Sequence, residues 1–242
     1  MIPADYLASY RATLIHLIAT HGEERAMDLI VGGQFDTIGE LELSTLQTLG
    51  LQPGHHVIDV GCGSGRLAKK LLPFLTGRYV GTDILPELTA YAAKICARPD
   101  WEFHAVAEPV ISAPDNFADF ICCFSVFTHL LDEDIYRYLE ESRRTLRSGG
   151  RVVFSYLDFA VVTHWAIFEQ SLANRGPHRV LNKFIGKDAI RAWAAHLGLR
   201  VERLYDGPEP WIQHANPIIY ADGRIAPNPA EFGQSIAVLA KP

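Results

Sequence analysis

Apolar residues near the start of the chain recur every three or four positions, as at Leu7, Tyr10 and Leu14. This spacing places them on one face of an α-helix. A second helical pattern follows and is interrupted at Gly32-Gly33, where the lack of a β-carbon favours a turn. We therefore predict an all-helical N-terminal cap over residues 1–50.

Short apolar runs alternate with helical patterns from residue 51 onward. The runs that predict strands are residues 56–60, 79–83, 101–106, 120–126, 151–157, 200–206 and 233–240. The predicted helices between them are residues 66–75, 86–97, 133–147 and 187–196. This alternation is typical of an α/β fold, and strands that are apolar throughout indicate a mostly parallel sheet covered on both faces. We predict one such doubly wound domain over residues 51–242.

Two segments depart from this alternation. Residues 158–185 are rich in aromatic and histidine residues and follow the fifth predicted strand, and we interpret them as an inserted lid that covers the substrate. Residues 207–231 contain five prolines. Because proline lacks the N–H that a central strand needs, we predict an irregular loop there.

The charge balance limits the classes of partner. The chain has a formal net charge of -6, and its 22 lysines and arginines form no basic run. Since attraction to phosphates dominates nucleic-acid affinity, we expect no nucleic-acid partner. Asp5, Arg11 and His16 interrupt the apolar positions of the first helix, so we predict no signal peptide, no membrane partner and a cytoplasmic location. The oligomeric state stays open.

The cysteines show no metal-binding spacing. Cys122 and Cys123 are adjacent within an apolar run, and Cys62 and Cys96 are isolated, so no CxxC pair exists. Such cysteines are typical of a buried core in a reducing compartment. We predict that they bind no metal.

A glycine-rich turn follows the first predicted strand, in the segment Asp59-Val60-Gly61-Cys62-Gly63-Ser64-Gly65. Glycines allow a sharp turn and a close approach to a ligand, and the helix that begins next offers unpaired N–H groups. The dinucleotide fingerprint GxGxxG requires glycine or alanine where this chain has Arg66, which argues against a nicotinamide or flavin enzyme. Asp83 ends the next strand, where a carboxylate can accept both hydroxyls of a ribose. The pattern predicts an adenosine-bearing ligand.

These residues resemble motif I of the class I S-adenosylmethionine-dependent methyltransferases, and Asp83 matches the acidic residue of their second motif. The resemblance continues through Asn116–Phe120, which is similar to the fourth-strand motif, and through Leu146–Val152, which is similar to the L-x-x-G-G turn into strand five. It implies S-adenosylmethionine as cofactor and S-adenosylhomocysteine as product. It also implies a seven-stranded sheet of order 3-2-1-4-5-7-6 with strand seven antiparallel.

The same resemblance implies a set of cofactor-contacting residues. They lie in the glycine turn and at the ends of the second and fourth strands, and are Asp59, Gly61, Cys62, Gly63, Gly65, Asp83, Ile84, Phe124 and Ser125. One position departs from the family pattern. Ala107 stands where many members have an aspartate that bonds the adenine amino group, and Glu108 beside it is the candidate replacement.

Methyl transfer requires little from side chains, because the sulfonium is already an activated electrophile that needs mainly to be aligned. His129, which follows the fourth predicted strand, is a candidate base for the acceptor's proton; a histidine there also commonly caps a helix or bonds the backbone. The candidate acceptor-contacting residues, which alternatively fill the core, are Phe35, Tyr156, Trp165, Trp211 and His214.

We therefore predict a methyltransferase that acts on an oxygen, nitrogen or carbon atom of a small molecule. Two alternatives belong to other classes: a non-catalytic module that binds S-adenosylmethionine, and a nucleotide-dependent enzyme on a related sheet. A peptide acceptor remains open within the methyltransferase class. The cofactor that the protein binds distinguishes a methyltransferase from the nucleotide-dependent enzyme. Catalytic turnover distinguishes it from the non-catalytic binding module.

Overall fold

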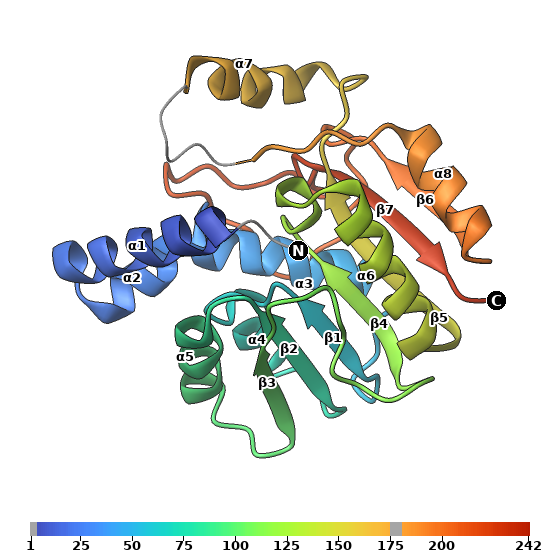
Figure 1. The fold of residues 1–242 in the computed structure, drawn as a ribbon, viewed down its shortest axis with the longest axis horizontal. Helices are drawn as coiled ribbons and strands as arrows, with labels where there is room; N and C mark the ends of the chain where they lie inside the picture. Colours follow the sequence, from blue (N-terminus) through green and yellow to red (C-terminus); the bar gives the residue numbers. More distant parts are fainter. Residues whose placement is uncertain (1–3, 175–180) are drawn as a thin grey trace. The chain divides into compact units, whose positions relative to one another are not determined.

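The computed structural model describes residues 4–174 and 181–242 (Figure 1). The chain forms two compact units: an N-terminal unit of residues 2–107 with 210–230, and a C-terminal unit of residues 108–209 with 231–242. The seven strands follow the order β3-β2-β1-β4-β5-β7-β6. The predicted fold class, including the position of the last strand, is confirmed.

The N-terminal unit contains three parallel strands, β1 (Val57–Val60), β2 (Tyr79–Asp83) and β3 (Trp101–Ala105). Every residue of β1 and β2 is buried, as expected for strands covered on both faces. The crossover helices are α4 (Arg66–Leu71) and α5 (Pro86–Cys96). The proline at the start of α5 suits the first turn of a helix, where no N–H is needed.

Three helices precede the first strand: α1 (Ala4–His21), α2 (Glu23–Ile30) and α3 (Phe35–Thr48). In Figure 1, α1 and α2 run side by side. The proline-rich loop is hydrogen-bonded to both ends of α3. The Thr37 hydroxyl donates to the carbonyl of Ile219 at 2.7 Å, and the Gln213 amide donates to the Thr48 hydroxyl at 2.9 Å.

The C-terminal unit contains β4 (Ala118–Cys123), β5 (Leu146–Tyr156), β6 (Arg200–Tyr205) and β7 (Ser235–Ala240). Strand β5 is parallel to β4, whereas β7 is antiparallel to both β5 and β6. The longer helices are α6 (Asp132–Thr145), α7 (Trp165–Ala173) and α8 (Lys187–His196), and short 3-10 helices span Phe127–His129 and Val162–His164. The fully buried β4 and β7 form the centre of this unit's core.

Several predicted boundaries were wrong in the C-terminal unit. Strand β4 ends at Cys123, because the chain turns at Ser125, which has a positive φ of 59°. The helix predicted to residue 147 ends at Thr145, and β5 begins at Leu146. Gly149 and Gly150 therefore do not end a helix. They lie inside β5, where its register with β4 shifts between Ala118 and Phe120.

Within residues 158–185, the structure contains helix α7, which the sequence pattern did not predict. None of its residues is buried, although most are apolar. Residues 175–180 of the predicted lid lie outside the described part of the chain.

Among the helices that the structure describes, none has both the length and the apolar character needed to cross a membrane.

Candidate functional site

The glycine turn connects β1 to α4 and is tied to β2. The amides of Gly61 and Cys62 both donate to the carbonyl of Thr82, at 2.7 and 2.9 Å. Gly63 and Gly65 have positive φ angles of 54° and 94°, a region that residues with a β-carbon rarely adopt. The turn thus leads directly into the N-terminus of α4, whose first amides have no partner within the helix.

Asp83 lies beside this turn and is buried, with 8% of its surface exposed. Its Oδ2 accepts the amide of Gly63 at 3.0 Å, and its Oδ1 accepts the amide of Leu85 at 3.0 Å. Burial raises the pKa of Asp83 to about 6, against the effect of these bonds. A carboxylate has about four acceptor positions, so this side chain can accept further hydrogen bonds.

Asp59 and Cys62 are also buried, but they face β2. The Tyr79 hydroxyl donates to Asp59 Oδ2 at 2.7 Å. The Cys62 thiol lies so close to Gly81 that a β-carbon there would be 2.9 Å from Sγ. Burial raises the pKa of Cys62 well above its ordinary value, so the thiol stays protonated. Both side chains support the turn from within the core.

Ile84, Ala107 and Glu108 have different environments. Ile84 directly follows Asp83, is half-buried, and packs against the apolar cluster of the N-terminal helices. Ala107 and Glu108 are exposed. The segment before them is fixed, because the Val106 amide donates to the Asp83 carbonyl at 2.8 Å.

Three of the residues predicted to contact the acceptor belong to the N-terminal unit. Phe35 is buried at the start of α3, with Lys69 Nζ 5.5 Å from its ring centre. Trp211 is half-buried, and its amide donates to the Ala230 carbonyl at 3.1 Å. The ring nitrogens of His214 lie 2.8 and 2.9 Å from the backbone carbonyls of Asn216 and Pro227. His214 therefore holds together two parts of the proline-rich loop.

Sequence reasoning missed the strongest polar contact of this region. Arg66 and Glu42 form a buried ion pair, and Arg66 also donates to the carbonyls of Val31 and Gly32. In the sequence, Arg66 is visible only as a departure from the dinucleotide fingerprint. A buried arginine requires a partner, but nothing in the spacing indicates which of the acidic residues of the chain provides it.

In the C-terminal unit, Phe124 and Ser125 directly follow β4. Phe124 is buried, and its ring stacks on Phe232 with centroids 5.3 Å apart. The Ser125 amide donates to the hydroxyl of Ser155 at 2.7 Å, and the Ser125 hydroxyl lies 3.4 Å from Gln234 Oε1. These bonds hold Ser125 in its positive-φ conformation, which few serines adopt.

His129 ends the 3-10 helix after β4 and has a defined orientation. Its Nδ1 lies 2.7 Å from the carbonyl of Leu181. A carbonyl only accepts, so Nδ1 carries the hydrogen, and in the neutral ring Nε2 has a free lone pair. Burial lowers the pKa of His129 from its ordinary value. The ring is therefore neutral near pH 7 and able to take a proton at Nε2.

Tyr156 and Trp165 differ sharply in exposure. Tyr156 is completely buried beside Phe154, and burial raises the pKa of its hydroxyl. Trp165 is 43% exposed and belongs to an aromatic cluster with Phe159, Phe168 and Phe184. The rings of Phe159 and Phe184 stack with centroids 4.1 Å apart. Phe159 is 44% exposed, so this cluster presents apolar surface.

Within residues 4–174 and 181–242, no three histidine, cysteine or acidic side chains gather as they do around a metal ion. The absence of a metal stays a prediction.

Comparison with known proteins decides the family. A family model described as a methyltransferase domain matches residues 36–204, which include the glycine turn, strands β1 to β5 and all of β6 except its last residue. The chain belongs to this methyltransferase family. It is a class I S-adenosylmethionine-dependent methyltransferase, and the resemblance seen in its sequence is confirmed.

The methyltransferase has curated and structural relatives. It is 27% identical over 175 residues to the ubiquinone biosynthesis O-methyltransferase of Xanthomonas euvesicatoria, covering 67% of this chain and 70% of that one. Its fold is similar to the methyltransferase in a complex with the Trm112 activator from Haloferax volcanii, with 16% identity and a TM-score of 0.65 over 98% and 97% of the two chains. It is also similar to magnesium protoporphyrin IX methyltransferase from Synechocystis, solved with bound S-adenosylhomocysteine, with 15% identity and a TM-score of 0.61 over 96% and 100% of the chains.

Proposed function

We propose that this methyltransferase transfers a methyl group to a hydroxyl oxygen of a small molecule. This narrows the sequence-based prediction of an oxygen, nitrogen or carbon acceptor. The orientation of His129 carries the proposal: its Nδ1 is bonded to Leu181 and, among the residues that the structure describes, no group bonds Nε2. A neutral imidazole of this kind is suited to take a hydroxyl proton. The O-methyltransferase named among the relatives agrees with this acceptor atom.

The glycine turn and Asp83 fit S-adenosylmethionine. Asp83 uses its two oxygens to accept backbone amides and keeps acceptor positions for ribose hydroxyls. A β-carbon on Gly65 would approach Ala92 to 3.1 Å, so the absence of side chains keeps the turn compact beside the ligand. We propose that Gly61, Gly63, Gly65, Asp83 and Ile84 hold the cofactor, with Asp59 and Cys62 supporting the turn from behind. S-adenosylmethionine, when bound, supplies a methyl group on a positively charged sulfur.

We also propose cofactor contacts for Phe124 and Ser125, as the family resemblance implies; the ring stack with Phe232 and the bond to Ser155 fix both residues. Glu108 is proposed to replace the aspartate that the family pattern places at Ala107; its exposed carboxylate leaves it free to accept a hydrogen bond.

We propose that the acceptor carries an apolar part that contacts the aromatic cluster of Phe159, Trp165, Phe168 and Phe184. The cluster is partly exposed, and aromatic rings gain free energy when such surface is covered. Its segment is connected to His129, because Leu181 bonds the imidazole and the Lys183 amide donates to the Thr128 carbonyl at 2.7 Å. Among the residues predicted to contact the methyl-accepting substrate, we favour Trp165. Phe35 and Tyr156 are buried, and His214 is bonded within its loop.

In this proposal, residues 1–50 form a helical cap, residues 158–185 form a lid and residues 207–231 form a loop beside the cap. The Trm112 activator belongs to the complex of the Haloferax protein. For the present chain we propose a small-molecule substrate and no nucleic-acid partner, because its net charge is -6.

Calorimetry first tests the cofactor, with separate titrations of S-adenosylmethionine, S-adenosylhomocysteine and NAD. We expect binding of the first two compounds only. Binding of NAD, or of none of the three, contradicts the cofactor assignment. A screen of phenols, aliphatic alcohols and amines for release of S-adenosylhomocysteine then tests the acceptor. Cofactor binding without turnover on any acceptor class favours the non-catalytic module.

Replacement of His129 tests the proposed base. We expect His129→Gln to lower kcat by about 100-fold with a phenol or alcohol acceptor, because general-base catalysis typically contributes this much. S-adenosylhomocysteine affinity should stay the same. A control Glu140→Gln variant changes an exposed residue of α6 in the same unit, outside the proposed lid, and should keep wild-type kcat. Full activity of His129→Gln at pH 7 would show that His129 only bonds the backbone.

A further inference from the structure

Arg66 is the first residue of α4 and directly follows the glycine turn. Its Nε lies 3.1 and 3.2 Å from the two carboxylate oxygens of Glu42, and its Nη2 lies 2.5 Å from Oε1. Glu42 is only 2% exposed and Arg66 only 9%. Such a two-pronged bond fixes the plane of the guanidinium and therefore the direction of its remaining N–H groups.

Those remaining groups reach the C-terminal end of α2. Arg66 Nη1 donates to the carbonyls of Val31 and Gly32 at 3.2 and 3.1 Å. The last carbonyls of a helix have no partner within it, and the helix dipole favours a cation at this end. At and after this contact, Gly32 and Gly33 have positive φ angles of 71° and 66° and turn the chain toward α3. Arg66 thus holds α2 just before its exit turn.

Val31, which Arg66 holds through its carbonyl, covers the glycine turn. A β-carbon on Gly63 would collide with the side chain of Val31, and the Gly63 amide is the one that donates to Asp83 Oδ2. A second bond ties the same helix to the same turn, because the Ser64 hydroxyl donates to the Met27 carbonyl at 2.7 Å. A shift of α2 therefore changes the space above Gly63, next to Asp83.

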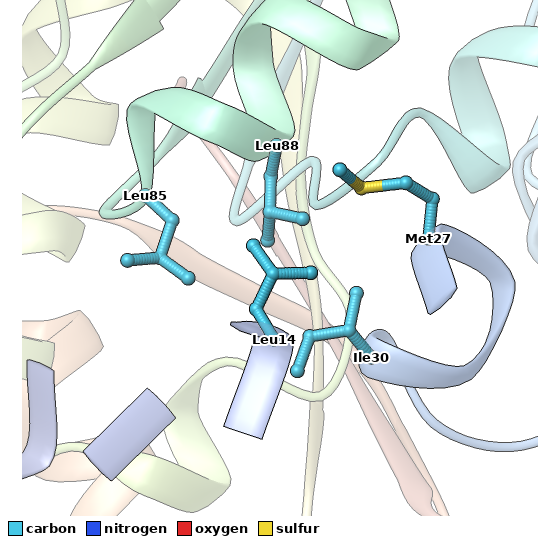
Figure 2. Close-up of a cluster of buried hydrophobic side chains, with 5 residues drawn as sticks. All are labelled: Leu14, Met27, Ile30, Leu85 and Leu88. Atoms are coloured by element: carbon cyan, nitrogen blue, oxygen red, sulfur yellow. The ribbon is translucent and has the colours of Figure 1, made fainter. Parts of the chain in front are cut away.

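The apolar side of α2 reaches the residues after Asp83. Figure 2 shows Leu14 of α1 and Met27 and Ile30 of α2 pointing toward Leu85 and Leu88 at the start of α5. Val31 and Ile84 pack against this cluster as partly buried members. Val31, which Arg66 positions, and Ile84, a proposed cofactor contact, thus pack against one apolar cluster.

We propose that Arg66 is a positioning residue for the cofactor site: with Glu42 it clamps the end of α2 over Gly63, and this clamp sets the affinity for the cofactor. The inference rests on the proposed cofactor role of the glycine turn. Lysine cannot replace Arg66, because one ammonium cannot bond a buried carboxylate and two carbonyls in this fixed geometry.

The test removes the clamp without leaving a buried charge alone. Replacing both members of a buried ion pair by apolar residues commonly preserves the fold, whereas removing one member leaves an unpaired charge. In the double variant Arg66→Met with Glu42→Met, we expect the Kd for S-adenosylhomocysteine and the KM for S-adenosylmethionine to rise at least about tenfold. The kcat should stay within about threefold of wild type, because no group that touches the acceptor is changed.

The matched control breaks a different ion pair of α2. Lys94 Nζ lies 3.0 Å from Glu23 Oε2, and both side chains are mostly exposed. We expect Lys94→Ala to bind S-adenosylhomocysteine with wild-type affinity. A folded double variant that binds within about twofold of wild type overturns the inference but leaves the proposed function intact, whereas failure of the wild type to bind S-adenosylhomocysteine overturns both.

Hydrogen exchange of the wild-type protein gives a readout that does not depend on a variant. If α2 covers the bound cofactor, S-adenosylhomocysteine slows exchange of the amides of Glu23–Ile30 and of the Gly32-Gly33 turn. In the double variant, this protection should be lost, while the amides of β1 remain protected. Unchanged exchange of α2 in the wild type on ligand binding contradicts the clamp.

Discussion

Asp83 combines burial with hydrogen bonds from two backbone amides, and these influences act in opposite directions on its pKa. Burial dominates and raises the pKa from 3.8 to about 6. In the free protein, protonation of Asp83 thus stabilises the fold. This contribution is fully present below pH 3.8 and is lost as the pH rises through about 6. The ionised carboxylate that a ribose requires is therefore held at a cost to stability.

Cofactor affinity should consequently depend on pH in the opposite sense. Ribose hydroxyls donate best to the ionised carboxylate, so the Kd for S-adenosylhomocysteine should be constant above about pH 7. Below about pH 6 it should rise by up to about tenfold per pH unit. Calorimetry between pH 5 and 8 measures this dependence.

The variant Asp83→Asn provides the control for this pH profile. It cannot ionise, so we expect weaker binding at pH 8 and little change of Kd down to pH 5. If the wild type and Asp83→Asn show parallel profiles, another group causes the pH dependence and Asp83 does not hold the ribose.

At the scale of the elements, apolar patterning predicted β2 and α8 at their observed bounds, Tyr79–Asp83 and Lys187–His196. It failed where a boundary depends on contacts distant in the sequence. The turn at Ser125 is held by Ser155, and the extension of β5 depends on its pairing with β4. Helix α7 buries none of its residues, so it does not need the apolar stripe by which a core-packing helix is recognised in a sequence.

The same distinction applies to the candidate site. The glycine turn and Asp83 are adjacent to strands that the pattern predicts, so their approach to one another follows from parallel strands alone. The clamp of Arg66 on Glu42, Val31 and Gly32 joins residues whose relation depends on how α2 and α3 turn. The orientation of His129 depends in the same way on Leu181. Sequence patterns therefore identify candidate residues but not the residues that they contact in the fold.

The extension of β5 gives a prediction about stability. A β-carbon on Gly150 would lie 2.9 Å from the Ala118 carbonyl oxygen and 3.0 Å from that of Arg147. We expect Gly150→Ala to destabilise the protein by about 1–3 kcal/mol, because a packed backbone must shift. Urea unfolding measures the change. Gly54→Ala is the control, since nothing lies within 4 Å of a β-carbon there; equal stability of the two variants would argue against close packing at the start of β5.

At the scale of the whole molecule, neither compact unit is one continuous stretch of chain. The chain passes between the units after residues 107, 209 and 230, and all seven strands belong to one sheet. If one unit unfolded alone, its segments would stay attached at their ends to the unit that remains folded. We therefore expect one cooperative unfolding transition, although the proposed cofactor contacts of the glycine turn and Asp83 lie in the N-terminal unit.

Ligand binding provides the test of this cooperativity. A ligand that binds only the folded state at about 100 times its Kd stabilises that state by about 2.7 kcal/mol. For a chain of this length, we expect S-adenosylhomocysteine to raise the midpoint of a single calorimetric transition by about 5–10 °C. Asp83→Ala should lose most of this shift, and NAD should cause none. Two transitions, of which S-adenosylhomocysteine moves only one, would show that the units unfold independently and that cofactor binding stabilises only the N-terminal unit.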